Sequence, residues 1–352
     1  MFKNALYTLT HWEAWDWRIK YIPLVPSWIW YCMRSGSFWF FTPSNPSLDF
    51  GGLDGISKKD IYDQLPSNLC PKTIFISKKI LFDEVEKSFV LNGFNYPVAV
   101  KPEIGRMGFM FRKIETVKEL KLYHEKMPVN YILQEFIHYP IEVSVFYYRF
   151  PGENKGTITG FIKKESLQVV GDGKSTLYKL IAESQRAFLR MEEMKLKHKD
   201  KLDEIIPGGE VFHLSHALNL SRGGRLVSLE HEKDEKLLKV FDELSNYSKH
   251  FYYGRYDIKC ASIDRLKDGK DFSILEYNGS GAEPHHVYGN GNTLVTACKI
   301  LLQHWKVLYQ ISKCNYKKGI NYWKWSKGWK FFKEANSHVR LLKQLDAQFP
   351  VS

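Results

Sequence analysis

The sequence predicts an α+β fold in which antiparallel strand pairs are separated by helices. Three observations support this prediction. Apolar residues alternate at strand spacing in some central segments and recur every three or four residues in others. The strands come in pairs rather than singly between helices, which is not the pattern of regular βαβ units. The 352 residues are 44% hydrophobic, which is enough for a sizeable core and too much for a disordered chain.

The expected elements follow from these periodicities and from the turn residues between them. Residues 42–56 are dense in Pro, Gly, Ser and Asn and predict a turn-rich connection. Helices are expected at 58–64, 81–89, 116–126, 177–196, 235–247 and 292–308. Strands are expected at 73–77, 96–101, 109–114, 131–136, 142–150, 156–162, 255–263 and 272–277. The longest of these predictions is a single amphipathic helix over 177–196.

The composition of the chain excludes several classes of protein. The chain has 51 Lys and Arg against 39 Asp and Glu, a formal net charge of +12. The cysteines are odd in number and far apart, which excludes a disulfide scaffold and a Cys-based zinc site: Cys32, Cys70, Cys260, Cys298 and Cys314. The most apolar segment, 21–33, contains two prolines and is too short to span a membrane. A cytoplasmic location, peripheral to the membrane if the chain touches one, is expected.

All ten tryptophans lie near the two ends of the chain, within 12–39 and 305–329. In the second segment they interleave with lysines up to Lys333. This pattern fits an anionic membrane surface or a nucleic-acid strand. It also fits a small aromatic core with a solvated lysine rim. No nucleic-acid module accompanies the charge, so a nucleic-acid partner is not expected. We expect 12–41 and 305–333 to lie together.

Two late strands bring polar residues to one face. A turn centred between residues 266 and 267 pairs residues whose numbers sum to 533, which places Asp257 opposite Glu276 and Arg255 opposite Asn278. Opposite residues share a face, as do residues two apart on one strand. Two carboxylates and an amide suit Mg²⁺, and the arginine could hold a phosphate or an oxyanion. Paired charges on a solvated sheet face are the alternative.

A glycine-containing loop follows the strand at 96–101. In residues 97–108, PVAVKPEIGRMG, Lys101 ends an apolar strand and Gly105 and Gly108 follow in the loop. Such a loop lets backbone N–H groups approach phosphates while the lysine supplies charge. The segment is not a Walker A sequence, and by itself it is a weak signal.

Together these segments resemble the ATP-grasp superfamily over about residues 58–300. Residues 97–108 resemble its phosphate-covering loop, and LQEFIHYPIEVSVF at 133–146 resembles its adenine-binding hinge. Residues 254–263 and 272–284 resemble its two metal-binding strands. Within the superfamily, residues 168–181 and 216–224 are similar to cyanophycin synthetases, and the whole is similar to D-alanine–D-alanine ligases.

The resemblance implies a role for each matching residue. ATP would be bound by Lys58, Lys101, Gly105, Gly108, Glu135, Phe136, Ile137 and Glu142. Mg²⁺ would be bound by Asp257, Glu276 and Asn278; one or two ions are implied, and Mn²⁺ could substitute. Arg255 and Lys101 would act in catalysis. The implied division is an aromatic N-terminal segment (1–57), a smaller subdomain (58–140), a larger one (141–304) and a basic, aromatic helical tail (305–352).

The sequence departs from the ligase branch at two places. Residues 279–288, GSGAEPHHVY, replace a serine-containing substrate loop, and residues 1–57 lack the βαβ pattern of the usual preceding domain. D-alanine is therefore not the expected substrate. Within the first of these segments, His285 and His286 could bind substrate, act as an acid/base pair or cap the next helix, and the structural role is favoured.

The expected activity is an ADP-forming ligase that joins a carboxylate to an amine, or to a thiol, through an acylphosphate. The substrates are not identified by the sequence, and a lipid-linked one follows if the aromatic ends meet a membrane. The alternatives are an ATP-grasp kinase acting on a hydroxyl and a nucleotide-binding adaptor at the membrane.

Overall fold

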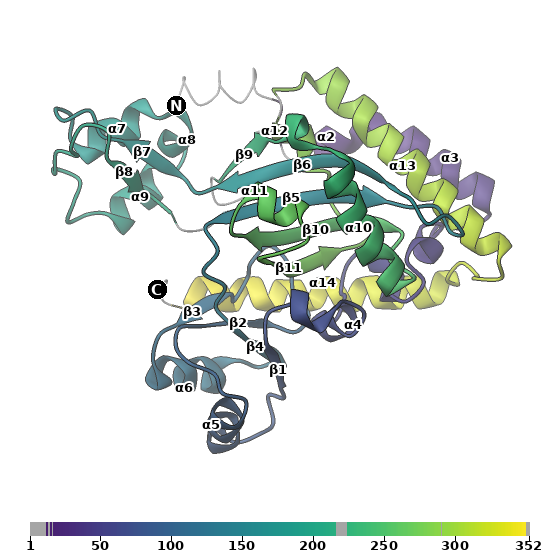
Figure 1. Ribbon diagram of the computed structural model, residues 1–352, viewed down its shortest axis with the longest axis horizontal. Coiled ribbons are helices and arrows are strands. Elements are labelled where there is room, and N and C mark those ends of the chain that lie inside the picture. The colour runs from purple at the N-terminus through teal and green to yellow at the C-terminus, as the bar shows by residue number, and fades with distance from the viewer. Residues whose placement is uncertain (1–11, 13–14, 16, 216–223, 290, 350–352) are drawn as a thin grey trace.

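The computed structural model describes residues 12, 15, 17–215, 224–289 and 291–349, and its two main sheets confirm a mixed helix and sheet class (Figure 1). Both sheets consist of antiparallel neighbours. The smaller sheet lies before residue 140 and the larger one after it. The division of the chain into four parts stays a prediction.

The smaller sheet has four strands in the order β1-β4-β2-β3. Its strands are β1 (Thr73–Ile76), β2 (Val98–Pro102), β3 (Arg112–Ile114) and β4 (Tyr131–Glu135). Helices α5 (Phe82–Leu91) and α6 (Val117–Lys126) share one apolar core with it. Apolar residues recur at helical spacing in α6 because they pack into that core, in which Leu120 and Tyr123 are both buried.

The larger sheet has five strands in the order β11-β10-β5-β6-β9. Its strands are β5 (Ile141–Tyr148), β6 (Thr157–Glu165), β9 (Arg225–Ser228), β10 (Tyr253–Cys260) and β11 (Phe272–Asn278). Helix α10 (Glu235–Ser248) covers one face (Figure 1). Val143 and Val145 of β5 and Tyr256 and Ile258 of β10 point into this core. The residues that lie between these core residues along β5 and β10 therefore point to the opposite face of the sheet.

A small unit lies between β6 and β9, and here one prediction is wrong. The single helix expected over 177–196 is three short helices, α7 (Leu177–Glu183), α8 (Gln185–Phe188) and α9 (Met191–Lys197), beside a hairpin of β7 (Gln168–Val170) and β8 (Val211–His213). Ser184 is extended and ends α7. The breaks let all three helices turn their apolar residues into one small core, which a straight helix would not reach. Of the predicted motif at 216–224, residues 216–223 lie outside the described residues.

The two aromatic ends lie together, as expected for their described residues. The N-terminal helices are α2 (Trp17–Tyr21) and α3 (Val25–Ser35), and the C-terminal ones are α13 (Leu294–Lys317) and α14 (Trp325–Gln348). Trp28 contacts Trp305 with ring centroids 4.9 Å apart, and Trp39 stacks on Trp325 at 5.6 Å. Many of these rings form a packed core, so the aromatic-core interpretation holds for part of the cluster. No described helix is long and apolar enough to cross a membrane.

Helix α14 connects this aromatic cluster to the smaller sheet. It begins beside Trp39, runs along the edge of the larger sheet and ends next to β3 (Figure 1). Near its start, Gly328 is buried against Trp39, whose indole N–H donates to the carbonyl of Trp325 over 3.2 Å. Glycine is required there because a Cβ would lie 2.4 Å from the Trp39 indole nitrogen.

We expect Gly328→Ala to destabilise the protein although alanine favours helix. The clash with Trp39 costs about 1–3 kcal/mol, which outweighs the ~1 kcal/mol that alanine contributes to a helix interior. Urea unfolding measures the difference. Ser326→Ala, at an exposed position of the same turn, is the control. A G328A protein as stable as the S326A protein would contradict this packing.

Candidate active site

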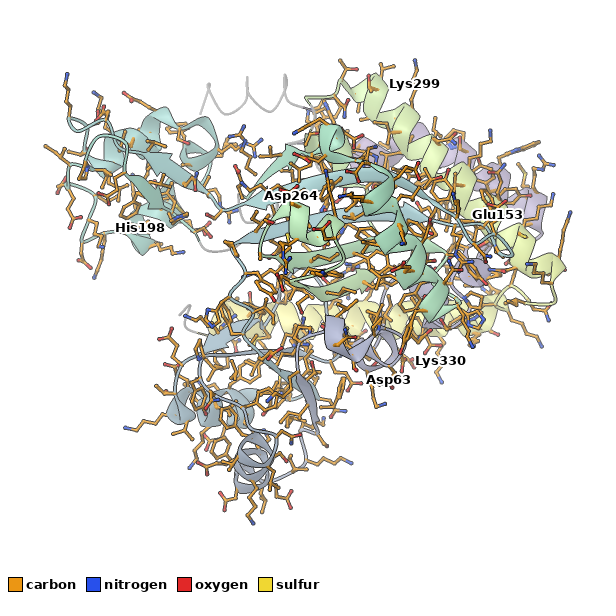
Figure 2. The ribbon with its side chains drawn as sticks, viewed as in Figure 1. Asp63, Glu153, His198, Asp264, Lys299 and Lys330 are labelled. Carbon is orange, nitrogen blue, oxygen red and sulfur yellow. The ribbon has the colours of Figure 1, made fainter. Side chains whose placement is uncertain are left out.

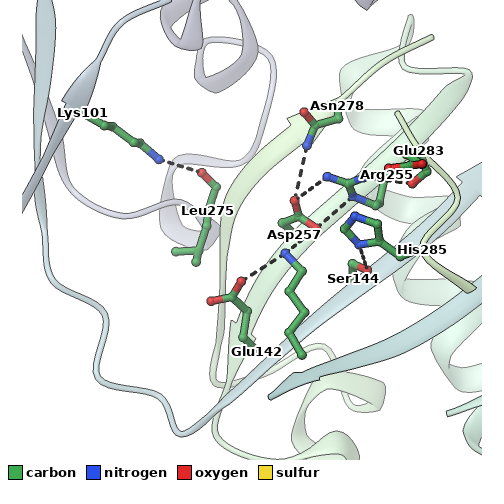
Figure 3. A network of polar contacts seen from close by, with 10 residues as sticks. Lys101, Glu142, Ser144, Arg255, Asp257, Leu275, Asn278, Glu283 and His285 are labelled. Carbon is green, nitrogen blue, oxygen red and sulfur yellow. Dashed lines mark hydrogen bonds and ion pairs between the residues drawn. The ribbon is translucent and has the colours of Figure 1, made fainter. Parts of the chain in front are cut away.

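The face of the larger sheet opposite α10 carries a row of charged side chains. Alternation places Arg255 and Asp257 of β10 on this face, together with Glu142 of β5 and Lys164 of β6. One end of the face is covered, because Phe146 packs against His304 of α13 with ring centroids 4.5 Å apart. The charged residues lie at the other end, toward the smaller sheet (Figure 3).

The predicted pairing of the two late strands is confirmed. Asp257 lies opposite Glu276 and Arg255 opposite Asn278. The connection is not the expected turn, however, because α11 (Ile263–Lys267) forms within it. A bulge between Asp257 and Ile258 shifts the register, so the constant sum of 533 holds only on the side of the candidate site. Bulges are common next to active sites, where they aim a side chain.

Asp257 is the buried centre of the charged network. Its carboxylate accepts from Arg255 Nε over 3.1 Å and from Arg255 Nη2 over 3.0 Å, and Lys164 Nζ lies 3.1 Å away (Figure 3). Asn278 Nδ2 adds a longer contact of 3.4 Å. Burial alone would raise the pKa of Asp257, but the charges of Arg255 and Lys164 lower it well below its usual value. The group is therefore a carboxylate at any physiological pH.

Lys164 is a residue that the sequence analysis missed. Its ammonium bridges Glu142 and Asp257, at 3.1 Å from each. It is buried, and the two carboxylates raise its pKa above the ordinary value although burial acts against them. The signal was present, since Lys164 lies directly opposite Glu142 in the β5–β6 pair. Finding it required the register of a hairpin that contains a second bulge, between Phe146 and Tyr147.

The two histidines after β11 have different surroundings. His286 begins α12 (His286–Gly289), in agreement with the favoured structural role. His285 contacts Ser144 Oγ through Nδ1 over 3.1 Å, beside the charged network (Figure 3). Burial, with the charges of Arg255 and Lys164, lowers the pKa of His285 well below its usual range, so the ring is neutral at pH 7.

Lys101 reaches the same region from the smaller sheet, and Lys58 reaches it from a helix that packs against β11. Lys101, on β2, donates to the carbonyl of Leu275 over 3.2 Å, next to Glu276. Lys58, at the start of α4 (Lys58–Tyr62), donates to the carbonyls of Glu103 and Gly105 over 3.3 and 3.4 Å. Burial lowers the pKa of both lysines, to about 8 for Lys58, and the carboxylate of Glu276 opposes the shift in each. The structure thus brings both predicted lysines near Glu276.

Helix α14 holds the glycine loop, which no sequence pattern predicted. His338 bonds the carbonyl of Ile104 over 2.8 Å, and Leu342 packs where a Cβ on Gly105 would lie. Asp346 accepts from the backbone N–H of Met110 over 2.8 Å and pairs with Arg112 over 2.9 Å. Gly108 has φ of +71°, a conformation that favours glycine. The loop is therefore fixed from outside by residues more than 230 positions away.

The predicted hinge lines a cavity of about 300 Å³. Residues 135–139 form one wall, and Cys70 and Ser273 lie on the other side. Phe136 lies between the ammonium groups of Lys113 and Lys259, at 5.2 and 5.3 Å from its ring. Glu135 Oε1 accepts from the backbone N–H of Lys72, and the carbonyl of Ile137 accepts from Lys259. The lining combines the aromatic rings of Phe136 and Phe272 with polar Asn68 and Ser273, a combination that suits a planar base.

Some of the side chains that could bind a metal ion lie close together. Among the described residues, no group of three or more His, Cys, Asp or Glu side chains is arranged to hold an ion. Asp257 and Glu276 face each other across two strands, and Asn278 lies two residues beyond Glu276. Two carboxylates with one amide fit Mg²⁺ when phosphate oxygens and water complete the coordination. The Asn278 amide would have to turn its oxygen toward the site, because its nitrogen now faces Asp257.

We expect Asp346→Ala to destabilise the chain and loosen the glycine loop. The change leaves the guanidinium of Arg112 buried without this carboxylate, which costs ~3–5 kcal/mol, and removes the acceptor of the Met110 N–H. Urea unfolding measures the first effect, and hydrogen exchange of residues 104–111 measures the second. Gln344→Ala, exposed on the same helix, is the control. Unchanged exchange of the Met110 amide would show that α14 does not hold the loop.

Lys58 makes stability depend on pH. Its pKa falls from 10.5 in the unfolded chain to about 8 in the folded one. Between these values the unfolded chain binds more protons, so the free energy of unfolding rises with pH. The advantage of the wild type over Lys58→Met should therefore grow by up to about 3 kcal/mol across this window. Urea unfolding at several pH values tests this, with exposed Lys59→Met as a control that shows no such rise. A difference that is constant with pH would contradict the shift.

Comparison with family models gives no match, and comparison with curated protein sequences gives none either. Solved structures give matches. They include a bifunctional glutathione synthetase from Pasteurella multocida (13% identity, TM-score 0.40, 66% of this chain and 34% of that one). They also include the VanG D-Ala:D-Ser ligase from Enterococcus faecalis (15% identity, TM-score 0.42, 76% of this chain and 63% of that one). A third is the ATP-grasp ligase PsnB (11% identity, TM-score 0.37, 71% of this chain and 60% of that one). The chain spans less than two thirds of the length of each of these three.

The chain's own features agree with the resemblance that its sequence shows. The glycine loop, the hinge and the two late strands occur in the order that the sequence resemblance requires. The strand register brings the predicted residues of the late strands opposite one another, and Lys101 approaches them from the other sheet. These motifs and this register fit the resemblance to the ATP-grasp superfamily, and an ATP-grasp ligase is among the solved structures to which the chain is similar.

Proposed function

We propose that the protein is a Mg·ATP-dependent ligase that joins a carboxylate to an amine, or to a thiol, through an acylphosphate. One observation carries the proposal. Buried cations from both sheets surround the carboxylates of Asp257 and Glu276: Lys58 and Lys101 on one side, Arg255 and Lys164 on the other. Arg255 and Lys164 are paired with carboxylates, whereas the buried ammonium groups of Lys58 and Lys101 donate to backbone carbonyls. The phosphates of a nucleotide would supply anionic partners to these two lysines.

The nucleotide would span the two sheets. The base would enter the cavity at 135–139 and meet the backbone of Phe136 and Ile137, and Glu142 would hold the ribose hydroxyls. Lys101 would contact the α- and β-phosphates, with the N–H groups around Gly105 and Gly108 above them. Lys58 would gain charge on binding, because a phosphate beside it opposes the lowering of its pKa.

The reaction needs no nucleophile from the protein. A substrate carboxylate oxygen attacks the γ-phosphorus and ADP leaves, which forms the acylphosphate. The amine then attacks the acyl carbon, inorganic phosphate leaves, and the amine loses a proton. Arg255 would stabilise the transferring phosphoryl group and the tetrahedral oxyanion. Bound Mg²⁺, held by Asp257, Glu276 and Asn278, would neutralise phosphate charge.

The acceptor side of the site would be formed by the segment after β11. The guanidinium of Arg255 donates to the carbonyl of Glu283 over 2.9 Å, which ties this segment to the charged network. Neutral His285 lies against the same network and offers a ring nitrogen to a substrate. These side chains differ from a serine-containing substrate loop, which supports an acid other than D-alanine.

We expect Glu276→Gln to abolish ATP turnover and to leave the fold intact. The second carboxylate is needed when the metal is bound, whereas in the free protein its repulsion of Asp257 opposes its attraction to Lys58 and Lys101. Release of ADP and phosphate across a panel of acids and amines measures turnover. Thermal melts with and without Mg·ATP measure binding, and the variant should lose most of the nucleotide-dependent shift.

Two results would count against the proposal. A Glu276→Gln protein that keeps the full Mg·ATP-dependent shift would remove Glu276 from the metal site. Failure of every acid to elicit ADP, or a stable phosphorylated product formed without an amine, would remove the ligase reaction. Glu243→Gln serves as the control, because that carboxylate is exposed on α10, which covers the opposite face of the sheet.

A further inference from the structure

The outer face of helix α3 is apolar, which is unusual for a helix at the surface. Its inner side packs through Trp28 and Tyr31 onto Trp305 and Tyr309 of α13. The outer side consists of exposed Val25, Ile29, Trp30 and Met33, with Met33 65% exposed, and exposed Ile22 lies in the short 3-10 helix just before α3. No residue of α3 is fully buried. A surface helix ordinarily turns polar residues outward, so this face is built to meet something apolar.

The apolar surface continues beyond α3. Exposed Phe38 contacts Trp325 at the start of α14, with ring centroids 5.3 Å apart, and Trp325 stacks on Trp329 at 5.7 Å. Both tryptophans are exposed. We call these eight residues the outer patch: Ile22, Val25, Ile29, Trp30, Met33, Phe38, Trp325 and Trp329. It joins the N-terminal helices to the beginning of α14.

The two segments that carry the outer patch contain no acidic residue. Residues 17–48 hold three basic residues and no Asp or Glu, and residues 284–333 hold nine lysines and no Asp or Glu. Arg34 lies over the Trp30 ring, and Lys333 lies over that of Trp329. Lys299 of α13 and Lys330 of α14 stand at the edge of the molecule (Figure 2). The patch is thus apolar at its centre and positive around it.

We propose that the outer patch rests in the interface of an anionic lipid bilayer, with α3 lying parallel to the surface. Aliphatic and tryptophan side chains on one helix face enter the boundary between headgroups and acyl chains, and surrounding basic residues bind anionic headgroups. A second copy of the chain fits less well, because it would bring two lysine-rich rims together with few carboxylates, such as Glu334 beside Lys330, to offset them. Single-stranded nucleic acid would require aromatic stacking, whereas most of α3's outer face is aliphatic.

The proposal does not depend on the ligase activity, because no residue of the outer patch belongs to the candidate active site. It places the other face of the molecule toward solvent and the start of α14 at the membrane. The end of α14 then holds the glycine loop, through His338 and Asp346. A lipid-linked substrate would be presented on the side of the chain where this helix begins.

Co-sedimentation of the full chain with vesicles at low salt tests the proposal. The probes are vesicles of phosphatidylcholine alone and of phosphatidylcholine with phosphatidylglycerol. The wild type should sediment with the anionic vesicles and should be released by salt. Lys327→Gln with Lys330→Gln should weaken binding about 25-fold, since each lysine contributes about five-fold, or ~1 kcal/mol. Ile29→Glu with Met33→Glu should remove detectable binding.

The matched control is Val90→Glu with Leu91→Glu, two exposed apolar residues at the end of α5, which should bind like the wild type. Urea unfolding confirms that each variant is folded. The proposal is overturned if the wild type does not sediment at low salt, sediments equally with neutral vesicles, or is unaffected by the I29E and M33E changes. It is also overturned if, without vesicles, those changes abolish a concentration-dependent dimer or binding to an oligonucleotide.

Discussion

The buried carboxylate of Asp257 is the interaction on which the organisation of the site depends. A buried charge is tolerated only when it is paired and hydrogen-bonded, and Arg255 and Lys164 provide both. Each cation fixes a further element. Lys164 joins β6 to β5 through Glu142, and Arg255 ties down the segment after β11 through the carbonyl of Glu283. The strands of the larger sheet are thereby held with a single polar face prepared for an anion.

A second constraint joins the two sheets. Lys101 of the smaller sheet and Lys58 of α4 extend to backbone carbonyls near Glu276 and the glycine loop, and burial lowers the pKa of both. Lowered pKa values mean that these ammonium groups are costly without a counterion. Binding of a polyphosphate between the sheets would relieve this cost, so the same groups that destabilise the free chain would contribute to affinity. This is the physical link between the architecture and the proposed reaction.

Helix α14 contacts two separate regions of the molecule. Its first turns belong to the aromatic cluster through Trp325 and buried Gly328, and its last turns hold the glycine loop through Leu342 and Asp346. One straight helix thus connects a surface that is apolar and basic with the loop proposed to cover phosphates.

The sequence by itself determined the alternation of elements, the hinge, the glycine loop and the pairing of Asp257 with Glu276, because these are local patterns or depend on one hairpin. The sequence-based prediction of one helix over 177–196 was wrong, because the apolar spacing continues across Ser184, where the first helix ends. Only the tertiary structure decided the roles of Lys164 and Asp346, whose partners lie 22 to 236 positions away. It also decided which tryptophans pack and which stay exposed, since burial depends on the elements that meet, and periodicity describes only one element at a time.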